Sequence, residues 1–382
     1  MAMPVQTMVS PHVTALFYHD LWWSLIAVLS TALMVLGGVW ALRRLDDATA
    51  VLRPVLTPLA HRTRGYRWLY WGLGAVWILD GLLQLQPAMP NSAFLEMVIT
   101  PLLSGQPTWM IHVLGAGIQR WSEAPVMANL AAVWIQGGIG LVLILGRNHR
   151  WGRLGLWATL GWGLVVWMWG EGLGGLLTGS ASWIAGSPGS VLMYMVSAGL
   201  LLLPDRRWRS GQVTAVLGWG LAGFWIVGAI LQSRPGSGYW RHLSPIFLQA
   251  AENAQPAWIS RPIYHVALWT ALHGPLANGV ATVGLLAVGL AWLWRPYRRV
   301  TGILTGVILA ALWWLGQDFG VFGGVGTDPQ TAPVLALLMA AGYAGASGGD
   351  VAQGARTGPR TSPMGGGTPE AAAVAAALGP RP

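Results

Sequence analysis

The chain has 382 residues, of which 54% are hydrophobic and 9% are charged, and its mean hydropathy is +0.52. A soluble domain carries about 25% charged residues, so this composition excludes an ordinary soluble protein. Cysteine is absent, which excludes disulfides and thiolate metal sites formed by this chain. The formal net charge is +9, but the positions of the arginines, described below, argue against a nucleic-acid partner.

Long apolar runs without charge predict helices that cross a hydrocarbon core about 30 Å thick. Such runs are too long for the short alternating strands of a membrane β-barrel. The sequence therefore predicts an all-α integral membrane protein with about nine transmembrane helices. The expected spans are residues 21–42, 68–85, 126–145, 154–170, 191–203, 213–231, 276–293, 300–316 and 334–346. Because no basic segment or convincing cleavage site precedes the first run, we expect it to be a retained helix rather than a signal peptide.

The arginines predict how these spans are threaded. Fifteen of them lie in alternate loops, between spans one and two, three and four, five and six, and seven and eight, whereas four lie in the other loops. Arginine-rich loops face the cytoplasm of a cell membrane. The sequence therefore predicts a plasma-membrane protein with its N-terminus outside and its C-terminus in the cytoplasm.

Two halves of the sequence resemble each other. Residues 77–87 align with 225–235, residues 106–109 with 255–258, and the glycine-rich corner 167–189 with 313–333. Each half holds four spans, an even number, so both enter the membrane in the same orientation as parallel repeats. We therefore expect an N-terminal transmembrane helix and cytoplasmic linker (1–66), a first four-helix repeat (67–205), a second four-helix repeat (206–346) and a disordered cytoplasmic tail (347–382).

The end of the third span carries a Gly-x-x-Leu-x-x-Gly-x-x-x-Arg pattern, in the run GLVLILGR at 140–147 and the arginine at 150. A four-helix unit with this pattern resembles the DoxX/DoxD-like membrane proteins. Such proteins often place an acidic residue in this span, where Gln136 stands here and Leu285 stands in the second half. Members include the membrane subunit of a thiosulfate:quinone oxidoreductase, so the resemblance implies a quinone-linked role with a quinone as ligand.

Four residues are candidates for a binding site. Asp80 lies inside an apolar span, where an ionisable group is costly and indicates either function or a bonded neighbour. Glu171 and Gln317 occupy equivalent places in the two corners, with Asp318 beside the latter. Interrupted short segments at matching positions of repeated membrane proteins indicate a binding site, although a loop that only packs the outer surface would have the same pattern. No catalytic residue is identified, and the histidines lack the compact spacing of a metal site.

Three functions are compatible with these residues. The first is a quinone-linked redox subunit that binds a small or lipophilic molecule at its outer face and works with a soluble or membrane redox partner. The second is a transporter or channel for ions or small molecules, and the third is a membrane scaffold without catalysis. The sequence does not decide whether the chain is an enzyme. The expected partner is the lipid bilayer, no nucleic acid is expected, and the oligomeric state stays open.

Overall fold

The computed structural model describes residues 5–43, 58–148, 150–252 and 256–356, and every regular element in these ranges is helical. The α-helices are α1 (Pro11–Arg43), α2 (Arg64–Leu83), α3 (Ser92–Phe94), α4 (Thr108–Glu123), α5 (Pro125–Leu145), α6 (Arg150–Val165), α7 (Ser190–Leu202), α8 (Asp205–Arg209), α9 (Gln212–Ser233), α10 (Ser244–Glu252), α11 (Ala257–Leu272), α12 (Gly274–Trp294), α13 (Arg299–Ala311) and α14 (Thr331–Arg356). Two π-helical turns, η6 (Val166–Gly170) and η9 (Leu312–Gly316), extend α6 and α13.

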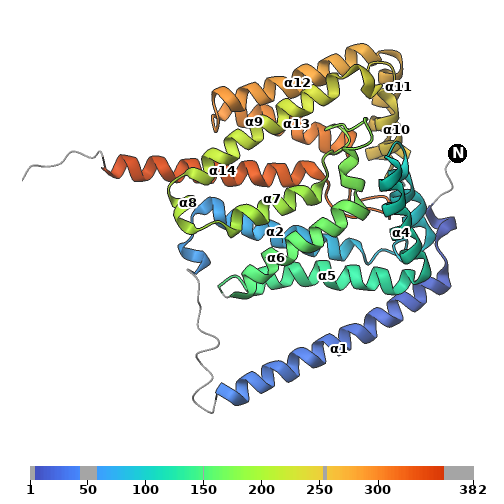
Figure 1. The fold of residues 1–382 in the computed structure, drawn as a ribbon, viewed down its shortest axis with the longest axis vertical. Helices are drawn as coiled ribbons and strands as arrows, with labels where there is room; N and C mark the ends of the chain where they lie inside the picture. Colours follow the sequence, from blue (N-terminus) through green and yellow to red (C-terminus); the bar gives the residue numbers. More distant parts are fainter. Residues whose placement is uncertain (1–4, 44–57, 149, 253–255, 357–382) are drawn as a thin grey trace, which may run out of the picture.

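The helices form a layered bundle in which α14, α2 and α7 lie between the remaining long helices (Figure 1). The short helices α4, α10 and α11 gather at one end of the bundle, which we call the loop end. The opposite end carries α8 and the α5–α6 and α12–α13 turns, which contain many of the arginines, and we call it the arginine end (Figure 1). Helix α1 contacts α5 near the loop end and diverges from the bundle toward its own C-terminus.

Five helical segments in the described ranges are long and apolar enough to cross a membrane: Pro11–Val35, Pro125–Leu145, Gln212–Ser233, Gly274–Trp294 and Arg299–Gly316. The other four expected spans are also helices, α2, α6 with η6, α7 and α14, but they are not among these five. Helix α7 has 13 residues. At 1.5 Å per residue it covers roughly 20 Å, less than the hydrocarbon core. The all-helical, membrane-type architecture is thus confirmed at this coarser level.

Two helix pairs, α2 with α5 and α9 with α12, pack closely because a glycine of α5 or α12 faces the partner helix. A Cβ atom added at Gly140 of α5 would lie 2.8 Å from the backbone oxygen of Gly74 in α2. A Cβ atom added at Gly289 of α12 would lie 3.2 Å from the backbone oxygen of Ala222 in α9. Small residues let membrane helices approach this closely. The α2–α5 and α9–α12 pairs are therefore built in the same way.

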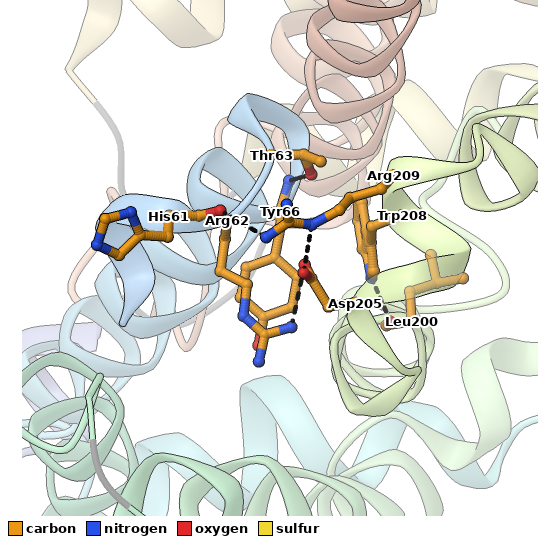
Figure 2. Close-up of polar contacts among 8 residues, drawn as sticks. All are labelled: His61, Arg62, Thr63, Tyr66, Leu200, Asp205, Trp208 and Arg209. Carbon is orange, nitrogen blue, oxygen red and sulfur yellow. Dashed lines mark hydrogen bonds and ion pairs between the residues drawn. The ribbon is translucent and has the colours of Figure 1, made fainter. Parts of the chain in front are cut away.

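The arginine end is held together by one carboxylate between two arginines (Figure 2). Asp205 at the start of α8 lies 3.2 Å from Arg62, just before α2, and 2.5 Å from Arg209 of its own helix. Arg209 also donates to the backbone oxygen of His61 at 3.2 Å, and the Arg62 guanidinium lies 4.9 Å from the centre of the Tyr66 ring. These contacts join the beginnings of the two halves.

Helix α14 extends past the point at which the composition of the sequence changes. Composition changes after Ala346, but α14 continues to Arg356. The alanine and glycine residues of this stretch continue the helix that begins at Thr331. Residues 357–382, most of the expected disordered tail, lie outside the described residues.

Candidate functional site

A cavity of about 530 Å³ lies in the first half of the chain, toward the loop end. Its walls come from α2, α4, α5, α6 with η6, and the 95–99 turn, and they are mostly apolar and aromatic. Four of its lining residues are also exposed on the outer surface of α5 and α6 with η6: Ala131, Ile135, Val165 and Trp169. A cavity of this size, with apolar walls and a few polar groups, is typical of a small-molecule site.

Several buried polar atoms in this wall have no partner. Within the described part of the chain, buried atoms without a hydrogen-bond partner occur in five lining side chains: the acceptors Gln84 Oε1, Gln136 Oε1 and Glu171 Oε2, and the donors Trp121 Nε1 and Trp162 Nε1. Gln84 and Gln136 are 4% and 5% exposed. Buried polar groups are normally hydrogen-bonded, so five open ones around one cavity indicate a place for a ligand or water.

Asp80 is buried and lies in the cavity wall. Asp80 is only 3% exposed. The hydroxyl of Tyr194 in α7 donates a 3.3 Å hydrogen bond to Oδ1 of Asp80. The Tyr194 ring packs edge-on against Trp77 at 5.2 Å, which fixes the hydroxyl in place. Asp80 therefore has both a bonded neighbour and a position in the cavity wall.

Glu171 connects the cavity to the start of α7. Its Oε1 atom accepts hydrogen bonds from the Ser190 hydroxyl at 2.7 Å and from the Val191 N–H at 3.1 Å, so it caps the helix, while Oε2 stays open. Burial raises the pKa of the Glu171 carboxyl, and the nearby Asp328 carboxylate raises it further, whereas these hydrogen bonds lower it. The protonated and ionised forms of Glu171 are therefore closer in free energy than those of an exposed glutamate.

Gln317 and Asp318 lie in the second corner and outside the wall of this cavity. Gln317 Oε1 accepts from the Ala332 N–H at 3.0 Å, which caps α14 as Glu171 caps α7. Asp318 Oδ1 accepts from the Gly320 N–H at 3.0 Å within its own turn. Of the four candidates, the structure thus brings Asp80 and Glu171 together and leaves Gln317 and Asp318 in a helix-capping turn.

The two corners have the same backbone course. Residues 172–174 have φ angles of 54°, 57° and 61°, and residues 318–320 have φ angles of 43°, 64° and 68°. Trp167 donates to the Pro188 backbone oxygen at 2.8 Å, and Trp313 donates to the Pro329 backbone oxygen at 2.9 Å. In each corner, a tryptophan N–H bonds to the loop before the next helix. The side-chain oxygen of Glu171 or Gln317 accepts from the first turn of that helix, α7 or α14.

Asp328, Gln84 and Gln136 are wall residues that the sequence did not single out as binding candidates. Asp328 comes from the loop that follows the second corner and reaches the first half, where Gln86 Nε2 also donates to the Gly326 backbone oxygen at 2.8 Å. Burial raises the pKa of Asp328 as well. The available signal was Gln136, a polar residue inside an expected apolar span.

The matching place in the second half is filled by Trp183. Gly228 corresponds to Asp80 in the alignment, and a Cβ atom added there would lie 2.7 Å from Trp183 Cδ1. Trp183 comes from the loop that follows the first corner, is 5% exposed and packs against Phe224 with ring centres 5.2 Å apart. Each half thus receives a loop from the other, but Asp328 leaves the first cavity open whereas Trp183 fills the second.

Comparisons of the chain with protein-family models, with curated proteins and with solved structures found no match.

Proposed function

We propose that the chain is a multipass membrane protein that takes a small lipophilic molecule from the bilayer into the cavity of its first half. The observation that carries this proposal is an apolar cavity whose exposed edge lies on α5 and α6 and whose wall holds five buried polar atoms without partners among the described residues. Apolar walls favour the body of a lipophilic molecule, and the open polar atoms provide fixed hydrogen-bonding positions for its head.

The proposed architecture is one N-terminal helix followed by two parallel four-helix units, about nine spans in total. The matching α2–α5 and α9–α12 contacts and the matching corners support this arrangement. In the proposed orientation in the plasma membrane, the arginine end faces the cytoplasm and the cavity lies toward the outer face. The cysteine-free sequence permits a direct test. Ser104→Cys at the loop end should react with an external thiol reagent and Arg150→Cys should not, and the reverse result would contradict the orientation.

The DoxX/DoxD resemblance adds a quinone as one candidate ligand and a redox membrane subunit as one candidate role. The open indole N–H groups of Trp121 and Trp162 are suited to the carbonyl oxygens of a quinone. Electrons would then pass between the quinone and a partner protein. A transporter or a scaffold is the alternative, and flux of the bound molecule into liposomes separates a transporter from both.

Binding is tested with the protein in phosphatidylcholine nanodiscs, using calorimetric titration with 1,4-naphthoquinone and with 1-naphthalenemethanol. Ala131→Phe places a large ring at the exposed edge of the cavity and should remove binding of both probes. The control is Val280→Phe in α12, where the side chain is 64% exposed and lies outside the wall of this cavity. Equal binding to wild type and Ala131→Phe would exclude this cavity as the site.

A further inference from the structure

We infer that the cavity binds a lipophilic amine in its protonated form, an apolar molecule whose head carries positive charge and N–H donors. This inference rests on the proposed function only in that the cavity is a ligand site. It names the class of ligand from the charge and hydrogen-bonding character of the wall.

The first observation is a group of three carboxyl groups without a basic partner. Three carboxyl groups, those of Asp80, Glu171 and Asp328, line the same cavity. Among the described residues, none of them lies within 4 Å of an arginine or histidine nitrogen. The basic side chain in the wall is Arg120, which is 86% exposed and lies 3.5 Å from Glu123 at the rim. A cationic ligand would supply the missing positive charge.

The second observation is the surplus of acceptors. Gln84 Oε1, Gln136 Oε1 and Glu171 Oε2 are buried without partners in the described part of the chain. The carboxyl groups of Asp80 and Asp328 accept hydrogen bonds from Tyr194, Thr327 and Gln330, and their oxygens have further lone pairs. A protonated primary amine has three N–H donors and no acceptor, which complements such a wall. A quinone head has only acceptors, so it would leave these oxygens unpaired.

The third observation is the set of indole rings around the cavity. Trp77, Trp121, Trp162 and Trp169 all line it. Tryptophan is the side chain whose ring face attracts organic cations best, and acidic groups beside aromatic rings are typical of ammonium sites. In the described residues, no group of three histidine or acidic side chains is disposed to hold a metal ion, so the same carboxyl groups do not suit a metal cation.

Glu171 makes the expected binding depend on proton release. Burial raises the pKa of Glu171 and of Asp328, and the Ser190 hydroxyl contacts both carboxyl groups. A cation in the cavity stabilises the ionised forms and lowers these pKa values again. Amine binding should therefore release protons to the buffer, and the binding heat should change with the ionisation enthalpy of the buffer. The binding heat of the neutral alcohol should not change in this way.

The experiment uses probes with one naphthalene body in phosphatidylcholine nanodiscs, which lack anionic lipid. We expect 1-naphthylmethylamine to bind about ten-fold more tightly than 1-naphthalenemethanol or 1,4-naphthoquinone, because ion pairing and cation–π contacts add to the same apolar contacts. In Glu171→Gln/Asp328→Asn this preference should disappear while the alcohol still binds. The matched control Glu123→Gln, at the exposed rim, should keep the preference.

A second arm needs only the wild-type protein. The trimethylammonium analogue of the amine keeps the charge but has no N–H donor, so it should bind more weakly than the primary amine. Equal binding of amine and alcohol to wild type, or a preference that survives in the double variant, would overturn the amine assignment while leaving the cavity as a binding site. If no naphthalene probe binds wild type, the cavity proposal and the amine assignment both fail.

Discussion

The same pair of side chains has different surroundings in the two halves of the molecule. In the second half, Gln232 Oε1 accepts from Ser182 at 2.8 Å and Gln232 Nε2 donates to Asn278 Oδ1 at 2.7 Å, so these groups satisfy one another. In the first half, Gln84 aligns with Gln232, and Asn129 Nδ2 donates to the Gln84 backbone oxygen as Asn278 Nδ2 does to that of Gln232. Gln84 Oε1 and Asn129 Oδ1, however, lack partners among the described residues. Similar sequences can thus give the same glutamine side chain hydrogen-bond partners in one half and leave its oxygen open in the other half.

The difference originates in the exchanged loops rather than in the helices. The loop after the first corner carries Ser182 and Trp183 into the second half, where they complete the hydrogen bonds and fill the space above Gly228. The loop after the second corner carries Thr327 and Asp328 to the first half, where they line the cavity. The helix pairs pack similarly in the two halves, and the loops determine which half contains the cavity.

The largest expected effect comes from removing the side chain that closes the second half. Trp183→Ala should lower the free energy of unfolding by about 3–5 kcal/mol, the usual cost of truncating a buried tryptophan. It should also open a cavity in the second half. Thermal unfolding measures the loss, and a naphthalene probe that binds to Trp183→Ala/Ala131→Phe would show that the second half had become a site. Trp258→Ala, at a side chain 67% exposed at the loop end, is the control and should unfold at nearly the wild-type temperature.

The shared helix contacts offer the next test. Gly140→Ala and Gly289→Ala each place a methyl group against the facing helix, and each should cost about 1–3 kcal/mol, since the packed backbones have little room to separate. Gly140→Ala should cost more, because its nearest backbone atoms lie at 2.8 Å rather than at 3.0 and 3.2 Å. Gly138→Ala is the matched control, since no atom lies within 4 Å of an added Cβ there. Equal unfolding temperatures for all three variants would contradict the common construction of the two pairs.

The helical membrane-type fold could be predicted from the sequence because apolar length and charge are local properties. The likeness of the two glycine-rich corners is visible in the sequence, and it led to Glu171. The contribution of Asp328 could not, since it depends on a loop crossing from one half to the other, and nothing in the sequence around residue 328 specifies its destination. The repeat also suggested similar roles for Glu171 and Gln317. The structure gives both a capping bond but places only Glu171 beside the cavity, because Trp183 occupies the matching space.

The pH dependence of stability should differ between the two corners. The raised pKa of Glu171 means that the folded state holds this proton more firmly than the unfolded state does. Stability from this group is complete below its unfolded-state pKa and falls as pH rises through the folded-state pKa, by at most about 1.4 kcal/mol per pH unit. The Glu171→Gln variant should fold, because Gln317 already occupies the equivalent position in the second corner. Its stability should decrease less as pH rises. Gln317→Glu should steepen the decrease. Identical pH profiles for wild type and Glu171→Gln would exclude Glu171 as the source.

The smallest expected effect concerns the junction at the arginine end, where the beginnings of the two halves meet. Asp205→Asn removes the negative charge between Arg62 and Arg209 while keeping the shape of the side chain. The site is partly exposed, so salt screens the pairs and the loss should be about 1 kcal/mol or less. Because this contact is remote from the cavity, probe affinity should not change. Thermal unfolding at low and high salt provides the measurement: the difference between wild type and Asp205→Asn should shrink as salt is added. A difference that persists at high salt would show that the aspartate acts through shape or hydrogen bonding rather than through its charge.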